Sequence, residues 1–185
     1  MTYSLTWLAD TLRAAGLTVV EVPGWKVAGR AEMGPVKGVL CHHTAGPKSG
    51  NAPSIGTVEH GRPDLAGPLA QLVLGRDGTF YTVAAGRCNH AGKGAWQGVT
   101  MGNTSFIGIE AENTGLPDDP WPEVQMKAYA RGVAAILHHV GAKPIMCAGH
   151  KEYALPAGRK TDPSFSMDVF RIRVAAELAD LGKKP

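Results

Sequence analysis

Residues 39–46 read Val-Leu-Cys-His-His-Thr-Ala-Gly, an apolar run that ends in two histidines and continues into a loop. A short, continuously apolar run is typical of a strand that is buried on both faces of a sheet. We therefore expect a central β-strand over residues 37–43, with the histidines at its end. Neighbouring strand residues face opposite sides, so only one of His42 and His43 can point toward a site at that edge.

The segments around this strand predict a mixture of helices and strands. Apolar residues at helical spacing predict helices over 4–15, 122–140 and 167–181, the last of them capped by Ser166. Strands are expected over 17–22, 106–111 and 144–149, with a hairpin between 70–74 and 79–84 around Arg76-Asp77-Gly78. Residues 44–68, 86–105 and 150–166 read as loops, the first with a helical turn near 55–60. This irregular order predicts an α/β fold with a mixed central sheet flanked by helices.

Composition narrows the possible classes of protein. The 185 residues are 44% apolar, which suits one compact domain over 1–185, and we expect a monomer. The net charge of +3 comes without a run of Lys and Arg, so we expect no nucleic-acid partner. No apolar run reaches the roughly 20 residues of a membrane span, so we expect no membrane insertion. The start shows no secretory signal pattern, which predicts synthesis in the cytoplasm.

The cysteines predict buried thiols. There are three, and an odd count without short spacing argues against a disulfide framework. Cys41 and Cys147 lie inside apolar runs, where a free cysteine behaves as a small hydrophobic residue.

Three residues form a candidate metal site. His42 and His150 each end an expected strand, and Asp162 follows His150 by twelve residues. Imidazole nitrogen and carboxylate oxygen are zinc ligands, and a catalytic zinc site uses three protein ligands and a water. Spacing alone leaves open that these histidines are ordinary core or surface residues.

Several motifs, in order, resemble those of the type 2 N-acetylmuramoyl-L-alanine amidases and peptidoglycan recognition proteins. They are residues 39–46, Gly75-Arg76-Asp77-Gly78-Thr79, Asn89-His90-Ala91-Gly92, Ser105-Phe106-Ile107-Gly108-Ile109-Glu110, Ala148-Gly149-His150 and Arg159-Lys160-Thr161-Asp162-Pro163. The resemblance covers residues 39–163, while the helix and strand expected within 1–35 are atypical of the family. It implies that His42, rather than His43, joins His150 and Asp162 in holding Zn²⁺.

The strand over 106–111 places Glu110 and Glu112 on one face, a pattern that a solvated sheet face would also show. The resemblance singles out Glu110 as the carboxylate beside the metal and implies that Lys160 stabilises the oxyanion; a solvated loop lysine is the alternative. Glu112 could orient Lys160 or the substrate. Some family members use a tyrosine before the hairpin in place of this glutamate. The aligned residue here is Ala70, so the resemblance points more strongly to Glu110 for this role.

The resemblance implies hydrolysis of the amide between N-acetylmuramic acid and L-alanine in peptidoglycan. His90, Trp96 and Glu112 are candidates for contacting the glycan strand and stem peptide, with an anchor for its loop as the alternative for Trp96. A single catalytic domain without a signal resembles a phage endolysin that reaches the cell wall after release. Alternatives are a cytoplasmic amidase that recycles muropeptides, a peptidoglycan-binding module without catalysis, and a different zinc amidohydrolase on the same fold.

Overall fold

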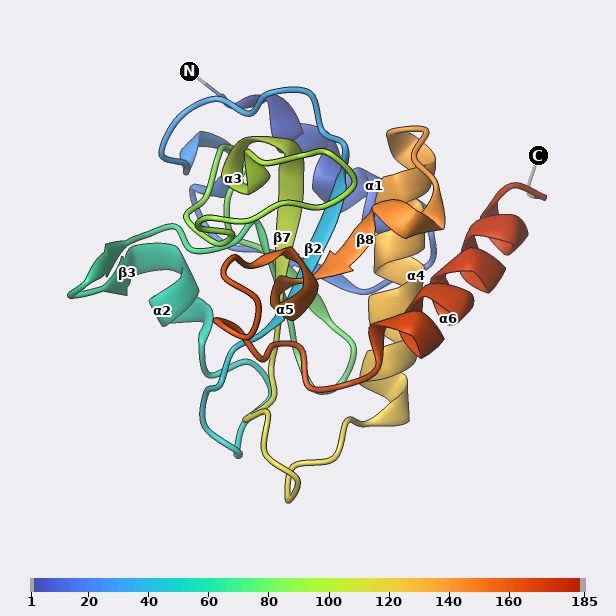
Figure 1. The fold of residues 1–185 in the computed structure, drawn as a ribbon. Coiled ribbons are helices and arrows are strands. Elements are labelled where there is room, and N and C mark those ends of the chain that lie inside the picture. The colour runs from blue at the N-terminus through green and yellow to red at the C-terminus, as the bar shows by residue number, and fades with distance from the viewer. Residues whose placement is uncertain (1, 184–185) are drawn as a thin grey trace.

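The computed structural model describes residues 2–183 and shows one α/β domain with a mixed sheet (Figure 1). The strands are β1 (Val19–Glu21), β2 (Gly38–His43), β3 (Gly61–Arg62), β4 (Leu65–Ala66), β5 (Leu72–Leu74), β6 (Phe80–Thr82), β7 (Phe106–Ala111) and β8 (Cys147–Gly149). The α-helices are α1 (Leu8–Ala14), α2 (Ile55–His60), α3 (Gly102–Ser105), α4 (Glu123–His139), α5 (His150–Tyr153) and α6 (Met167–Leu181). Short 3₁₀ helices are η1 (Ser4–Trp7), η2 (Trp25–Val27) and η3 (Pro144–Met146).

The main sheet has six strands in the order β1-β6-β5-β7-β2-β8. All neighbouring pairs run parallel except the β5–β6 hairpin, which is antiparallel. The mixed sheet expected from the sequence is therefore confirmed. Strand β2 lies between β7 and β8, which explains why its sequence is apolar without alternation.

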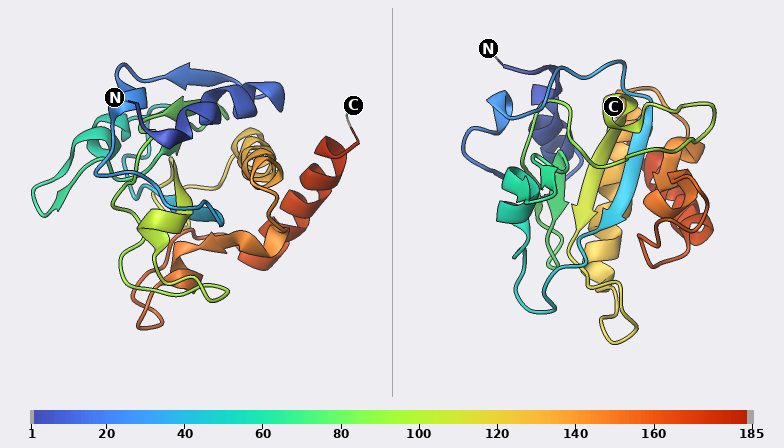
Figure 2. Two further views of the ribbon diagram at one scale, coloured as in Figure 1. Left: turned by 90° about the horizontal axis from the view of Figure 1, so that it is seen from above. Right: turned by 60° about the vertical axis from the view of Figure 1, so that its left-hand side comes forward.

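The two faces of the sheet are covered differently. Helices α1, α4 and α6 pack on one face, where Val39, Cys41 and Ile109 join their buried side chains in the largest core cluster (Figures 1 and 2). On the opposite face, Leu40 and Phe106 pack under residues of α5 and the loop at 86–105. Because side chains alternate along β2, His42 follows Leu40 onto this second face, away from α4.

Two segments differ from the sequence prediction. Residues 144–146 form the 3₁₀ helix η3, not the first half of a strand, because Pro144 has a fixed φ and no N–H for a strand ladder. The loop expected from His150 begins with the single turn of α5. The β3–β4 hairpin and α3 were not expected, since both are too short to give a periodic pattern.

All three cysteines are free and buried, as predicted for Cys41 and Cys147, and the Sγ atoms of these two are 3.6 Å apart on β2 and β8. The N-terminal segment belongs to the same core, because Leu5, Leu8 and Leu12 are buried in it. Within residues 2–183, no helix has the length and apolar character needed to cross a membrane.

Candidate metal centre

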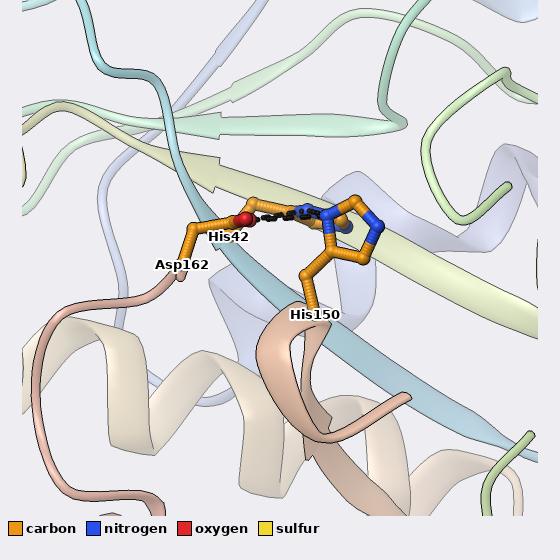
Figure 3. A group of neighbouring side chains, drawn as sticks. All are labelled: His42, His150 and Asp162. Atoms are coloured by element: carbon orange, nitrogen blue, oxygen red, sulfur yellow. Dashed lines mark hydrogen bonds and ion pairs between the residues drawn. The ribbon is translucent and has the colours of Figure 1, made fainter. Parts of the chain in front are cut away.

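Three side chains from separate segments meet just beyond the ends of β2 and β8. The Nδ1 atoms of His42 and His150 are 3.1 Å apart, and Oδ2 of Asp162 lies 3.0 Å from the first and 3.2 Å from the second. Figure 3 shows the three side chains turned toward one another. The two imidazoles are buried, with 1% and 4% of their residue surface exposed. The sequence-predicted ligand set therefore forms one compact cluster, as a shared metal ion would require.

Local sequence explains how Asp162 reaches the histidines. The loop after α5 folds back, and the amide of Lys151 donates a hydrogen bond of 2.7 Å to the carbonyl of Asp162. Pro163 then packs against the end of β8 at Gly149, where a Cβ atom would lie 3.1 Å from the proline ring and 2.9 Å from Met167. A residue with a side chain at Gly149 would press on both neighbours and displace the loop that carries the carboxylate.

The donor atoms fit a zinc ion. The Nε2 atom of His150 lies 3.0 Å from the carbonyl oxygen of Ala91, which can only accept, so Nε2 carries the proton and Nδ1 presents a lone pair to the cluster. Burial lowers the pKa of His42 from 6.5 to about 4, so this ring is neutral at neutral pH and free of a competing proton. Two neutral imidazoles and a carboxylate are a known ligand set for catalytic zinc.

Glu110 lies next to the cluster on the neighbouring strand. It is the register partner of His42 in the β2–β7 pair, and its Oε1 atom lies 3.9 Å from Nδ1 of His42. Its Oε2 atom is buried without a hydrogen-bond partner. Burial, followed by the nearby carboxylates of Asp162 and Glu112, raises the pKa of Glu110 well above 4.5. A carboxylate with a raised pKa and a free oxygen is equipped to accept a proton.

A pocket of about 280 Å³ opens over the cluster and contains Glu110 and Lys160 in its wall. The positive charges of Lys160 and Arg62 both act on Glu110 and partly offset the rise in its pKa. A larger cavity of about 630 Å³ lies on the other side of the sheet, lined by α4, α6 and the segment that follows α1, and none of the cluster residues line it. The smaller pocket is therefore the one in which chemistry at the cluster would occur.

A family model described as N-acetylmuramoyl-L-alanine amidase matches residues 32–165. The chain belongs to this family. The match contains the whole of the stretch 39–163 that carried the resemblance, and it confirms the enzyme class, an N-acetylmuramoyl-L-alanine amidase. A search of curated proteins finds no match.

Solved structures of amidases share the fold of this amidase. AmiD from E. coli, in complex with anhydro-N-acetylmuramic acid-L-Ala-D-gamma-Glu-L-Lys, is 22% identical over 78% of this chain, with a TM-score of 0.62; the match spans 59% of the AmiD chain. A selenomethionine derivative of AmpD is 23% identical over 94% of this chain and 99% of its own, with a TM-score of 0.63. A mutant endolysin from Bacillus subtilis is 17% identical over 85% of this chain and 99% of its own, with a TM-score of 0.57.

The three residues expected to contact substrate occupy different places. His90 lines the pocket, but it is 93% buried and its ring lies against His42. Trp96 does not line the pocket; its Nε1 donates to the carbonyl of Ile145 at 2.7 Å and its ring lies under Arg171, so it anchors its loop to η3 and α6. Sequence alone had left these two roles of Trp96 equally open.

Glu112 is fully buried and does not line the pocket. Its carboxylate accepts hydrogen bonds from the amide of Ser54 at 2.7 Å, from the Ser54 hydroxyl at 3.0 Å and from the Thr44 hydroxyl at 2.9 Å. These bonds tie the long loop after β2 to the end of β7. The geometry therefore gives Glu112 a role in holding the loop that forms one wall of the pocket, and we do not propose it as a substrate contact.

Two residues near the centre were missed by sequence reasoning. Arg62 reaches the pocket from the β3–β4 hairpin, which has no periodic signal. The hydroxyl of Tyr129, on α4, accepts a hydrogen bond from the amide of His42 at 3.1 Å, because β8 ends before it can pair with this residue. A single tyrosine among the alanines of a buried helix face was the available signal for such a polar contact.

Proposed function

We propose that the amidase is a zinc-dependent hydrolase that cuts the bond between N-acetylmuramic acid and L-alanine in cell-wall peptidoglycan. The observation that carries this proposal is the cluster of His42, His150 and Asp162 with Glu110 beside it in one pocket. A module that only binds peptidoglycan has no need of a complete ligand set with a proton acceptor next to it. The combination therefore favours catalysis over binding alone.

Each residue around the cluster has a definable task. A bound zinc ion would lower the pKa of a water molecule toward 7 and polarise the amide carbonyl. Glu110 would take the proton from the attacking water and deliver it to the leaving amine. Lys160 would hold the negative charge that develops on the carbonyl oxygen, because it lies in the same pocket wall. The burial of the site strengthens both electrostatic contributions.

The charges in the pocket support a substrate with carboxylates. Arg62, Arg159 and Lys160 line the pocket together, whereas Glu110 and Asp162 are its acidic residues. Stem peptides of peptidoglycan carry free carboxylates, which these cations can attract. The complex of AmiD with an anhydromuramoyl peptide supports the same substrate class for this chain.

The biological setting follows as a second part of the proposal. We propose that the chain acts as the amidase domain of a phage endolysin, made in the host cytoplasm and active on the wall after release. The shared fold of the Bacillus subtilis endolysin supports this reading. An amidase that recycles soluble muropeptides is the alternative, and the two differ in the size of the substrate that they accept.

The test is mass spectrometry of the products from purified sacculi and from soluble anhydro-muropeptides, with and without a chelator. We expect free stem peptides from intact sacculi, loss of this release with the chelator, and recovery when zinc is restored. Release from soluble muropeptides alone would support recycling. Binding to sacculi without any release would refute the enzymatic proposal.

A further inference from the structure

The ring of His90 lies between the proposed ligand His42 and the backbone of β7. Its Nδ1 atom is 3.2 Å from Nε2 of His42, and its Nε2 atom is 3.2 Å from the carbonyl oxygen of Phe106. The planes of the two rings are at 88° to each other, an edge-to-face arrangement. This arrangement is compatible with a hydrogen bond between the two ring nitrogens. His90 therefore contacts the side of His42 that faces away from the metal cluster.

The positions of the protons on His90 and His42 follow from the carbonyl of Phe106, the last acceptor in this series of contacts. The carbonyl of Phe106 can only accept, so Nε2 of His90 must carry the proton of the neutral ring. Its Nδ1 atom then has a lone pair and accepts a hydrogen bond from His42, so the proton of His42 is on Nε2. The Nδ1 atom of His42 is left with a lone pair, and this is the atom that points into the cluster.

We propose that His90 is a positioning residue, which fixes the tautomer and the orientation of His42 as a metal ligand. This inference rests on the proposed metal site and adds to it a residue that the sequence had suggested for substrate contact. Partners of this kind, which hold the far nitrogen of a ligand histidine, orient the ring and raise its basicity. The same stretch also serves the second histidine, because the carbonyl of Ala91 accepts the proton of His150 Nε2 at 3.0 Å.

The residues around His90 hold its ring in one position. Gly108 on β7 lies under it, and a Cβ atom there would come within 2.8 Å of Cγ of His90. The side-chain oxygen of Asn103 accepts hydrogen bonds from the amides of His90 and Ala91, at 2.9 and 2.7 Å. Gly108 leaves room for the ring, and the two hydrogen bonds to Asn103 hold the backbone of residues 90 and 91 in place. A residue held in this way on both its ring and its backbone suits a supporting role better than an adaptable substrate contact.

The test compares two replacements of His90 with a control. His90→Leu removes the acceptor for His42 at similar size, whereas His90→Asn offers a carbonyl oxygen near the position of Nδ1. His138→Leu is the matched control, since His138 is exposed at the end of α4. We expect zinc affinity, measured by competition with a chromophoric chelator, to fall about 10–100-fold in His90→Leu. It should fall clearly less in His90→Asn and remain unchanged in His138→Leu.

A spectroscopic readout on the wild-type chain tests the proton positions directly. Imidazole ¹⁵N chemical shifts of the metal-free protein should show His42 and His90 protonated on Nε2 only, and His90→Asn should preserve this pattern for His42. Protonation of His42 on Nδ1 in the wild type would overturn the inference, even if His90→Leu did not fold. Zinc binding by folded His90→Leu at wild-type affinity would overturn it as well. Failure of the wild type to bind zinc would instead refute the proposed function.

Discussion

Glutamine at position 110 would keep the shape of the Glu110 side chain and remove its ability to take a proton. General-base catalysis contributes about 10²–10⁴-fold, so we expect kcat to fall by that factor, which corresponds to about 3–5 kcal/mol in the activation barrier. Zinc content should not change. The proposed ligand atoms are 3.0–3.2 Å from one another, whereas Oε1 of Glu110 is 3.9 Å from Nδ1 of His42 and lies outside that set.

The same substitution should change how stability depends on pH in the metal-free protein. Burial and the neighbouring carboxylates raise the pKa of Glu110 above its ordinary 4.5, so the folded protein binds this proton more tightly than the unfolded chain does. The ionised group therefore lowers the free energy of unfolding as the pH rises above that ordinary value, and glutamine escapes this penalty. The variant should be more stable than the wild type at pH 8, and the difference should shrink toward pH 4.

Three measurements test these effects. They are the rate of turnover of sacculi, the content of bound zinc, and the free energy of unfolding by urea in the presence of chelator at several pH values. Glu112→Gln is the comparison, because Glu112 lies two residues further along and its carboxylate is held by Ser54 and Thr44. Wild-type turnover in Glu110→Gln together with an inactive but folded Glu112→Gln would show that the wrong carboxylate was chosen. Loss of zinc along with activity in Glu110→Gln would make Glu110 a ligand and refute its role as base.

Four further substitutions test the surroundings of the cluster. His150→Ala should lose zinc and activity together, and full turnover with stoichiometric zinc by metal analysis would contradict the ligand assignment. Lys160→Met should retain zinc but lower kcat about 10²–10³-fold in the sacculus assay, as expected for loss of an oxyanion partner. Tyr129→Phe leaves the buried amide of His42 without a partner, which costs about 1–3 kcal/mol and should lower Tm by roughly 2–12 °C in thermal unfolding. Glu112→Ala should make the loop that contains Ser54 more susceptible to limited proteolysis, with zinc affinity unchanged.

The central strand, and the face on which each of its side chains lies, could be predicted because both depend on the local sequence pattern. The apolar run before His42 predicts a buried strand, and alternation then places His42 and His43 on opposite faces. In the structure His42 turns to the cluster, while the ring of His43 lies 6.4 Å from that of Trp121. Strand β7 begins and ends at the expected residues, so the position of Glu110 near its end could also be predicted.

The partners of the polar side chains could not be predicted, because they depend on how distant loops return to the sheet. Glu110 and Glu112 are only two residues apart, yet Glu110 borders the pocket and Glu112 is enclosed by the loop that carries Ser54. Nothing in the sequence near Glu112 indicates that loop. Trp96 has the same ambiguity, which was resolved only by the carbonyl of Ile145, 49 residues away.

The register of the parallel strands gives the centre its geometry. His42 is paired with Glu110 across β2 and β7, and Cys41 is paired with Gly149 across β2 and β8, which places His150 directly after the last paired residue. A shift of either neighbouring strand by one residue would move its functional side chain by about 3.3 Å and turn it to the other face. Two ligands and the proposed base are thus fixed by the same backbone hydrogen bonds that hold the sheet together. Asp162 alone depends on a loop, and the close packing of Pro163 on Gly149 supplies for it the precision that strand pairing supplies for the others.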